Sequence, residues 1–345
     1  MSAELRFDAV PTVFNECVLI CDPARATIRS VSGNDGLRLG NGVLTRREIL
    51  LAAIGALAPL KADETIPIFD IHCHPPFPTH SEGWVLTHQR GLRIQTTALL
   101  PVNSAAARTG ILPSFTIAQG SAIRMATEYP DEFLAFTVAD PRKNDCSRVL
   151  RKYLGAGARG VGEMEYPIKC DSPKMDVVYQ LAQEYRAPVL MHFEHGASNM
   201  GFERFYRVAA KYPRLTFIGH AQTWWGNIDL RHRQEQIWPE PNWPVTPGGI
   251  TDRLLSECAN VFGDFSASSG LNALIRDRDH ARGFLARHQD KLLFGTDCLH
   301  HGLGGPQCWG RQTLEALREL APSKEILRKI LWTNARQLLR LPETL

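Results

Sequence analysis

Two histidines separated by a single residue close the stretch "IFDIHCHPPF", residues 68–77. An apolar run leads up to His72 and His74, and prolines follow directly behind them. Residues two apart in a β-strand face the same side, so both imidazoles are expected to point together from the end of a strand. Two converging imidazoles are suited to binding one metal ion. The stretch therefore predicts part of a metal site, and the remaining ligands must come from elsewhere in the chain.

The ends of four later apolar runs carry the same kinds of side chain. These runs end in "VGEMEY", "VLMHFEHG", "FIGHAQ" and "FGTDCLH", which supply Glu163, Glu165, His192, His220 and Asp297. One histidine near a strand end is usually a hydrogen-bonded packing residue. Packing gives no reason, however, for histidines and carboxylates to gather at the same end of several strands. Unlike titratable groups that converge on a cavity are what metal catalysis requires.

The elements that must position these side chains begin after Asp63, where short apolar runs alternate with helical patterns. Several of the helical stretches end in Gly or Pro, as helix stops do. Residues 322–341 predict a long final helix with Ser323 as its N-cap. The eight expected strands are 66–72, 93–100, 133–139, 158–165, 187–193, 215–221, 260–266 and 291–297.

This alternation over residues 63–345 predicts an α/β protein with a closed (β/α)8 TIM barrel. Enzymes with this fold build their sites at the carboxyl ends of the strands, where the histidines and carboxylates fall. An open, doubly wound sheet is the alternative fold. No G-x-G-x-x-G sequence follows any of the strands, which disfavours a dinucleotide-binding domain.

The set of His-x-His, Glu, His, His and Asp on strands one, four, five, six and eight resembles the amidohydrolase superfamily. The nearest branch is the amidohydrolase-related (type 2) family of metal-dependent TIM-barrel hydrolases. The resemblance extends over about residues 66–340 and includes the closing "ILWTNARQLLRL". The runs "FIGHAQTWW" and "GDFSASSGLNAL" also look like segments of exported family members. No single motif in the set identifies a substrate.

The resemblance implies a divalent metal, expected to be Zn2+, with one or two ions per chain. Asp297 would be an axial ligand of the first ion and the general base, and Glu163 would bridge to a second ion. His220 would be a metal ligand or act on the substrate. The implied metal ligands are His72, His74, Glu163, His192, His220 and Asp297.

The ligand on strand four departs from many relatives, in which it is a carboxylated lysine. Glu163 and Glu165 are both candidates here, since they share the same strand parity. Glu163 is preferred, because "VGE" resembles the strand-four glutamate of the metal-dependent deoxyribonuclease branch.

Three functions fit this pattern. The first is a hydrolase in which metal-activated water attacks an amide, lactone or ester bond of a small molecule. The second is a zinc-dependent decarboxylase like aminocarboxymuconate-semialdehyde decarboxylase, which would need one zinc and no strand-four glutamate. The third is a metal-binding protein without catalysis, which Asp297 disfavours, because a metal trap needs no base beside an open coordination position.

A long insertion follows the sixth strand, from Thr223 to about Gly249. It carries Trp224 and Trp225, which are candidates for walls of a substrate pocket. A small aromatic core inside the insertion is the alternative. His195 lies in the loop after the fifth strand and is a further candidate for substrate contact.

Composition sets the remaining bounds. The chain has 345 residues, 44% of them hydrophobic and 22% charged, with a net charge of +3. Its basic residues are interspersed with acids, which predicts solvated faces rather than a nucleic-acid site. No apolar run reaches the roughly 20 residues of a membrane-spanning helix, so no stable membrane insertion is expected. The expected partner is the small-molecule substrate that an enzyme of this kind implies. A homo-oligomer is compatible with the sequence. The eight cysteines form no Cys-x-x-Cys pair, and most are expected to be small buried side chains. Cys298 and Cys308 frame a glycine-rich loop and are candidates for a disulfide if the protein reaches an oxidising compartment.

The segment "TRREILLAAIGALAPLKADE" starts at Thr45 and carries Arg46 and Arg47 before an apolar run. It resembles a bacterial twin-arginine export signal. We therefore expect an N-terminal extension at 1–42 that is not part of the mature protein, a signal segment at 43–62, and a barrel at 63–345. Export to the periplasm follows from this interpretation. An ordinary helix in a cytoplasmic protein is the alternative.

Overall fold

The computed structural model describes residues 37–39, 42–44, 66–76, 81–102, 119–236, 240–298 and 304–342. The chain divides into two compact units, Met1–Ala62 and Asp63–Leu345. In the first unit, β1 (Leu37–Leu39) and β2 (Gly42–Leu44) form an antiparallel pair with Leu37 opposite Leu44. Arg46, Arg47 and the apolar run behind them lie outside the described residues, so the signal segment stays a prediction.

The second unit contains all eight expected strands, each shorter than its apolar run. Their central residues are almost all buried, which is why the sequence shows continuous apolar runs rather than alternation. The strands are β3 (Phe69–Cys73), β4 (Thr96–Leu99), β5 (Phe133–Ala135), β6 (Val161–Met164), β7 (Val189–His192), β8 (Phe217–His220), β9 (Val261–Asp264) and β10 (Leu292–Leu293).

Neighbouring strands run parallel in the orders β3-β4-β5 and β6-β7-β8-β9-β10. Backbone hydrogen bonds join the two sheets at both seams. The amide of Gly162 donates to the carbonyl of Thr137 over 2.8 Å, and the amide of Ile71 donates to the carbonyl of Phe294 over 3.0 Å. The strands therefore follow one another around a ring, which confirms the predicted (β/α)8 fold and excludes the open sheet.

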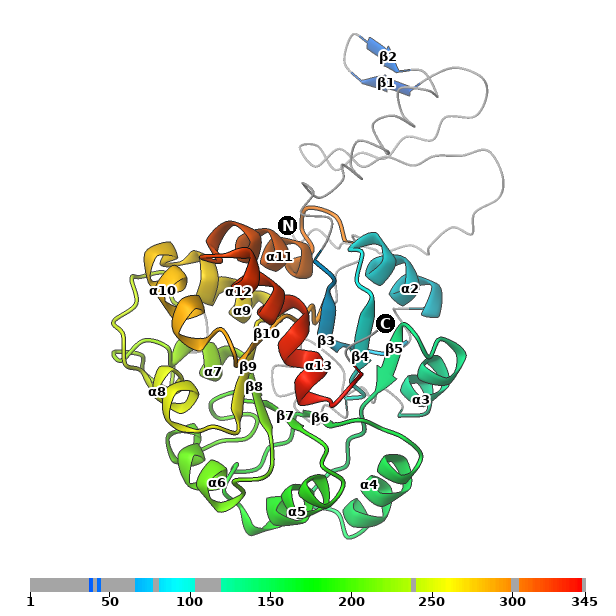
Figure 1. Cartoon of the computed structure of the whole chain (residues 1–345), viewed down its shortest axis with the longest axis vertical. Helices are drawn as coiled ribbons and strands as arrows, with labels where there is room; N and C mark the ends of the chain where they lie inside the picture. Colours follow the sequence, from blue (N-terminus) through cyan, green and yellow to red (C-terminus); the bar gives the residue numbers. More distant parts are fainter. Residues whose placement is uncertain are drawn as a thin grey trace, which may run out of the picture. The chain divides into compact units, whose positions relative to one another are not determined.

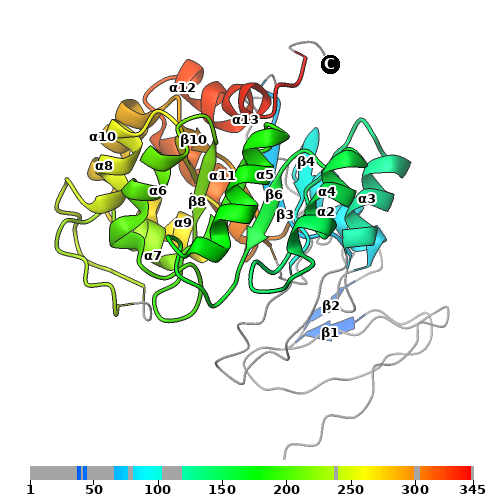
Figure 2. The same ribbon diagram turned by 90° about the horizontal axis from the view of Figure 1, so that it is seen from below.

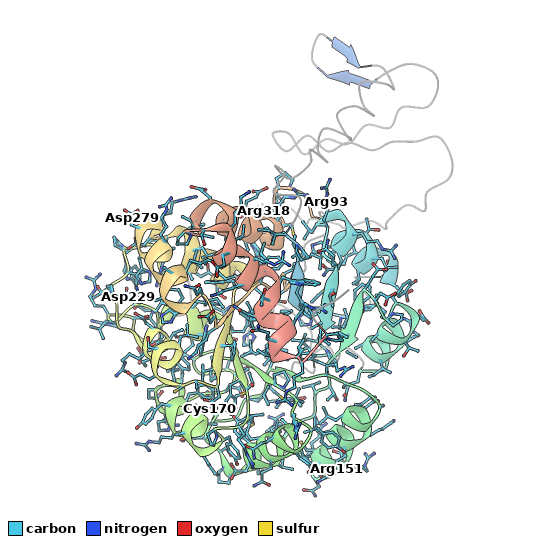
Figure 3. The ribbon with its side chains drawn as sticks, in the orientation of Figure 1. Arg93, Arg151, Cys170, Asp229, Asp279 and Arg318 are labelled. Carbon is cyan, nitrogen blue, oxygen red and sulfur yellow. The ribbon has the colours of Figure 1, made fainter. Side chains whose placement is uncertain are left out.

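Helices surround this ring (Figure 1). Charged side chains such as Arg151 and Asp279 lie at the periphery (Figure 3), and Arg151 pairs with Glu184. The helices before the final segment are α2 (Glu82–Gly91), α3 (Gln119–Glu128), α4 (Cys146–Gly155), α5 (Asp176–Glu184), α6 (Phe205–Lys211), α7 (Gln222–Gly226), α8 (Ile250–Glu257), α9 (Ala267–Ile275), α10 (Arg278–His288) and α11 (Trp309–Leu320). Among the helices in the described part of the chain, none is long and apolar enough to cross a membrane.

The final segment closes the amino-terminal end of the barrel. Ser323 Oγ accepts a hydrogen bond from the Ile326 amide over 3.2 Å, which confirms it as an N-cap. The predicted single helix is instead α12 (Lys324–Arg328), a π-helical turn (329–333) and α13 (Asn334–Leu338). Figure 2 shows α12 and α13 together at one end of the barrel. Trp332 packs with the barrel-interior residue Phe69, with ring centroids 6.3 Å apart.

Candidate metal centre

All six predicted metal ligands meet at the carboxyl ends of the strands, opposite α13. Each ligand atom lies within 4.8 Å of the others in its group. Three overlapping groups result: His72 with His74 and Glu163, His72 with His220 and Asp297, and Glu163 with His192 and His220.

His72 lies in β3, and His74 directly follows the last residue of that strand. The register of β3 against β4 shifts between Asp70 and Cys73. The rings of His72 and His74 lie 5.3 Å apart, edge to face. Gly295 makes room for His72 and Asp264, because a Cβ atom at that position would clash with Asp264 Oδ1 and come within 2.9 Å of His72 Cβ.

Hydrogen bonds fix the tautomer of His74. Its Nδ1 lies 2.9 Å from the backbone carbonyl oxygen of Leu100, which can only accept, so Nδ1 carries the proton. Nε2 then presents its lone pair to Asp297 Oδ1 at 3.0 Å and to Glu163 Oε2 at 3.7 Å. A lone pair that faces carboxylate oxygens is repulsive unless a proton or a metal ion lies between them.

A second buried carboxylate orients two further histidines. Asp264 Oδ2, at the end of β9, lies 2.8 Å from His72 Nδ1 and accepts the hydroxyl proton of Ser266 over 2.7 Å. Because the Ser266 hydroxyl donates its proton to Asp264, Ser266 Oγ accepts a hydrogen bond from His220 Nδ1 over 2.9 Å. Asp264 therefore turns Nε2 of both His72 and His220 toward the centre.

The sequence analysis did not single out Asp264 or Ser266. The signal was available, since "NVFGDFS" places an acid and a hydroxyl at the end of the seventh expected strand. That end lies at the same rim as the ligands.

The carboxylate of Glu163 lies in the middle of the four histidines. Its Oε2 faces His72 Nε2 at 3.4 Å and His74 Nε2 at 3.7 Å. Its Oε1 faces His192 Nδ1 at 2.6 Å and His220 Nε2 at 3.7 Å. Each oxygen thus serves a different pair of imidazoles.

Charges in the cluster depend strongly on one another. Burial raises the pKa of Glu163, but the imidazoles of His72 and His192 outweigh burial and hold that pKa well below its usual range. Burial likewise opposes charge on Asp297, yet His72, His220 and His74 lower its pKa. Burial lowers the pKa of His72, but the carboxylates of Asp297 and Glu163 raise it well above its usual value. The cluster therefore attracts cations, and protons and metal ions compete for the same nitrogen lone pairs.

The donor set fits a divalent metal. Four imidazoles and two carboxylates are the nitrogen and oxygen ligands that Zn2+ takes in catalytic sites. Among the described side chains, His72 Nε2 is buried and has no hydrogen-bond partner, although it faces two carboxylates. An orphaned buried nitrogen is costly, and a shared cation would satisfy it.

Asp70 joins the first and last strands beneath this cluster. Its fully buried carboxylate accepts four hydrogen bonds, from the amides of His72 and Thr296, the hydroxyl of Thr296 and the side chain of Gln89. Burial still raises the pKa of Asp70 to about 6. These contacts fix the backbone on either side of His72 and just before Asp297.

The backbone is strained where three of the strands end. Ala221 (φ 81°), Ala267 (φ 58°) and Asp297 (φ 42°) all have positive φ without being glycine. Ala221 follows His220, Ala267 follows Ser266, and Asp297 is itself one of the candidate ligands. Such conformations cost about 1–3 kcal/mol each and gather at functional sites, where surrounding contacts hold them.

The structure separates Glu165 from the centre. Glu165 lies with Glu194 on the far side of His192, where the three form another possible ligand group. Burial raises the pKa of Glu165 to about 7, and the nearby carboxylate of Glu163 adds to the shift against the opposing effect of His192. Sequence analysis did not single out Glu194.

The three predicted substrate-binding residues do not join the cluster. Trp224 and Trp225 are buried among aromatic side chains, and the Trp225 ring stacks on Phe265 at 4.3 Å. Both rings thus belong to the main hydrophobic core, and not to a separate aromatic core inside the insertion. His195 is exposed, and its backbone amide donates to Thr223 Oγ1 over 2.8 Å. Substrate contact by these residues stays a prediction.

Asp264→Asn is expected to weaken metal binding by about 10- to 100-fold, the typical cost of losing an acceptor behind a metal-binding histidine. An amide would present a donor to His72 and Ser266 and disturb both histidine tautomers. Competition with a chelating dye measures the affinity. Asp229→Asn is the matched control, since Asp229 is equally buried but bonds Trp243 over 2.9 Å, away from the cluster. An unchanged affinity in Asp264→Asn would contradict the orienting role.

Fold and cluster together define a (β/α)8-barrel protein with a metal-type centre of histidines and carboxylates at the carboxyl ends of its strands. The family model described as Amidohydrolase matches residues 69–341, and the chain belongs to this family. The resemblance inferred from the sequence is thereby confirmed. Comparison with curated proteins found no match.

Solved structures with similar folds include proteins of different activity. An uncharacterised TIM-barrel protein from Bordetella bronchiseptica is 18% identical, with a TM-score of 0.56 over 79% of this chain and 98% of that one. A 2,6-dihydroxybenzoate decarboxylase from Rhizobium is 16% identical, with a TM-score of 0.52 over 79% and 98%. A probable 2-pyrone-4,6-dicarboxylic acid hydrolase from Acinetobacter baumannii is 13% identical, with a TM-score of 0.53 over 79% and 99%. At these identities the likeness is one of fold.

Proposed function

We propose that this protein is a metal-dependent hydrolase that uses two divalent ions, with Zn2+ expected, to cleave an amide, lactone or ester bond of a small molecule. One observation supports this proposal above the others. The two oxygens of Glu163 face different pairs of histidines, His72 with His74 and His192 with His220. A carboxylate placed in this way can bridge two cations, which in two-metal hydrolytic sites lie about 3.5–4 Å apart.

Divalent ions in this set would supply a water molecule acidic enough to act near neutral pH and would polarise the carbonyl oxygen under attack. Asp297 is the group placed to take the proton. Its oxygens lie 3.0 Å from His74 Nε2 and 3.5 Å from His220 Nε2, and its lowered pKa keeps it ionised. It is then able to return the proton to the leaving group.

Some side chains of the cluster are partly exposed and others are buried among the residues that the structure describes. The side chains of Asp297, His192 and Glu194 are 15%, 15% and 23% exposed, whereas His72 is fully buried. Within the described residues, the open side of the cluster is therefore the one that carries Asp297, His192 and Glu194.

Glu163→Gln tests the proposal, because it keeps the shape of the side chain and removes its charge. A two-metal hydrolase is expected to lose its second ion and about 100-fold or more of its rate, since nothing then offsets the repulsion between the cations. Metal per chain is measured on protein purified without chelators. Turnover is measured on panels of lactones, amides, esters and aromatic carboxylic acids.

A different result would replace the proposal with the decarboxylase. That enzyme would hold one zinc on His72, His74, His192 and Asp297, leaving His220 for the substrate. The wild-type protein would then bind one ion, release carbon dioxide from an aromatic acid and tolerate Glu163→Gln. Glu128→Gln serves as control, because Glu128 lies on the surface and pairs only with Arg124 in the described ion pairs.

A further inference from the structure

A second group of possible metal ligands lies near the carboxyl end of β10, apart from the first. His88 is on α2, Cys298 follows β10, and Cys308 is the N-cap residue of α11. His88 Nε2 lies 3.2 Å from Cys308 Sγ, and Cys298 Sγ lies 3.2 Å from the same sulfur. All three residues are buried, and their ligand atoms lie within 4.8 Å of one another.

The imidazole is held so that its edge faces the sulfurs. The ring of Trp84 stacks on His88 with centroids 4.9 Å apart and planes 9° from parallel. The next residue, Gln89, is tied to Asp70 through a 3.0 Å hydrogen bond. These contacts fix the rotation of α2 and so fix where His88 Nε2 points.

Sulfur geometry favours a shared ion over a direct bond. Two thiolates on one tetrahedral Zn2+ lie about 3.8 Å apart, given Zn–S bonds of about 2.3 Å. A disulfide requires about 2.05 Å between the sulfurs. The observed 3.2 Å must open by roughly 0.6 Å for the ion but close by more than 1 Å for the disulfide. A disulfide also gives no reason for a buried imidazole beside the sulfurs.

We propose that His88, Cys298 and Cys308 bind one Zn2+ as a structural site distinct from the catalytic centre. Two thiol protons leave to solvent on binding, so the two thiolates balance the charge of the ion. Cys308 favours this state, because the amino-terminal end of α11 stabilises a negative charge. The fourth coordination position is left to a small exogenous ligand such as water.

The proposed ion would join three elements next to the catalytic centre. It would tie α2 and the start of α11 to the residue that follows Asp297. Its role is to hold this junction in place, and its existence does not depend on which reaction the centre catalyses. Loss of the ion is therefore expected to lower the thermal stability of the full-length protein.

Cobalt tests the site directly, because only sulfur ligands give Co2+ an intense near-ultraviolet charge-transfer band. The catalytic centre offers nitrogen and oxygen ligands alone. Reduced full-length protein, stripped with a chelator and titrated with Co2+, is expected to develop this band with one equivalent per chain. Added Zn2+ should bleach it, because the two ions compete for one site.

Variants assign the band to its ligands. Cys308→Ser should abolish it and lower the retained zinc by one ion per chain. Cys146→Ser is the matched control, since Cys146 is also buried but contacts the Ala139 carbonyl instead of a histidine. His72→Ala should keep the band while losing catalytic metal, which separates this site from the proposed function.

Two results would overturn the proposal. One is the absence of the band from reduced wild-type protein whose circular dichroism spectrum shows that it is folded. This test uses the wild-type protein alone and needs no variant. The other is a band that persists in folded Cys308→Ser protein. If the wild type shows no band and peptide mapping without reductant finds Cys298 linked to Cys308, a disulfide replaces the metal site.

Discussion

Asp297→Asn is expected to reduce turnover by about 10³-fold or more while the barrel keeps its fold. The amide cannot take a proton from water, and general bases contribute about 10²–10⁴-fold. The substitution also removes the negative charge that faces His72, His74 and His220. The affinity of the cluster for a cation should therefore fall. Steady-state kinetics with the substrate found by screening gives the rate, and far-ultraviolet circular dichroism checks the fold.

Asp279→Asn is the control for this variant, because the side chain of Asp279 is fully exposed and remote from the cluster. It should match the wild type in rate and metal content. If Asp297→Asn retained activity within a few-fold of wild type, Asp297 would not be the base. The assignment would then pass to another group at the open side of the cluster, with Glu194 the first to examine.

His72→Ala is expected to lower the affinity for metal by well over 100-fold. Disturbing only the acceptor behind a metal-binding histidine costs about 10- to 100-fold, and removing the ligand itself costs more. The loss would also leave Asp264 as a buried carboxylate with one partner fewer. Metal per chain after dialysis measures the effect, and activity should fall with occupancy.

His280→Ala provides the comparison, since no ligand group found among the described residues contains His280. It should retain its metal. Full occupancy in His72→Ala protein after dialysis would show that the ion binds elsewhere. The natural candidate would then be the group formed by Glu165, His192 and Glu194.

Sequence periodicity was sufficient for the ring of strands. Parallel strands that are covered on both faces read as continuous apolar runs, and every run became a strand. Their ends were overestimated, because apolar residues continue into the turns. The run at 291–297 shows this best, since only Leu292 and Leu293 are assigned to the strand. The residues that follow it curve toward the centre and carry Asp297.

The candidate ligands could be predicted because each one lies at or just beyond the end of a strand, and strand ends share one rim of a barrel. The partners that orient them were harder to find. The 2.8 Å contact between His72 and Asp264 joins residues 192 positions apart, and no local spacing encodes it. The group of His88, Cys298 and Cys308 was missed for the same reason. The sequence shows the two cysteines ten residues apart, but only the fold brings α2 beside them.

The seam between β3 and β10 joins the first and the last strand of the barrel, so the candidate metal centre cannot be complete until β10 has been synthesised. The carbonyl of His72 accepts from the amides of Thr296 and Asp297, across 224 positions in the case of Thr296. The ribosome therefore synthesises His72 and His74 long before Asp297, the carboxylate that completes the set of candidate ligands. A chain truncated before β10 would possess five of the six ligands and still lack both the seam and the base. Tight metal binding would thus require that β10 has been synthesised and that the barrel has closed. Metal binding could therefore distinguish complete molecules from truncated fragments.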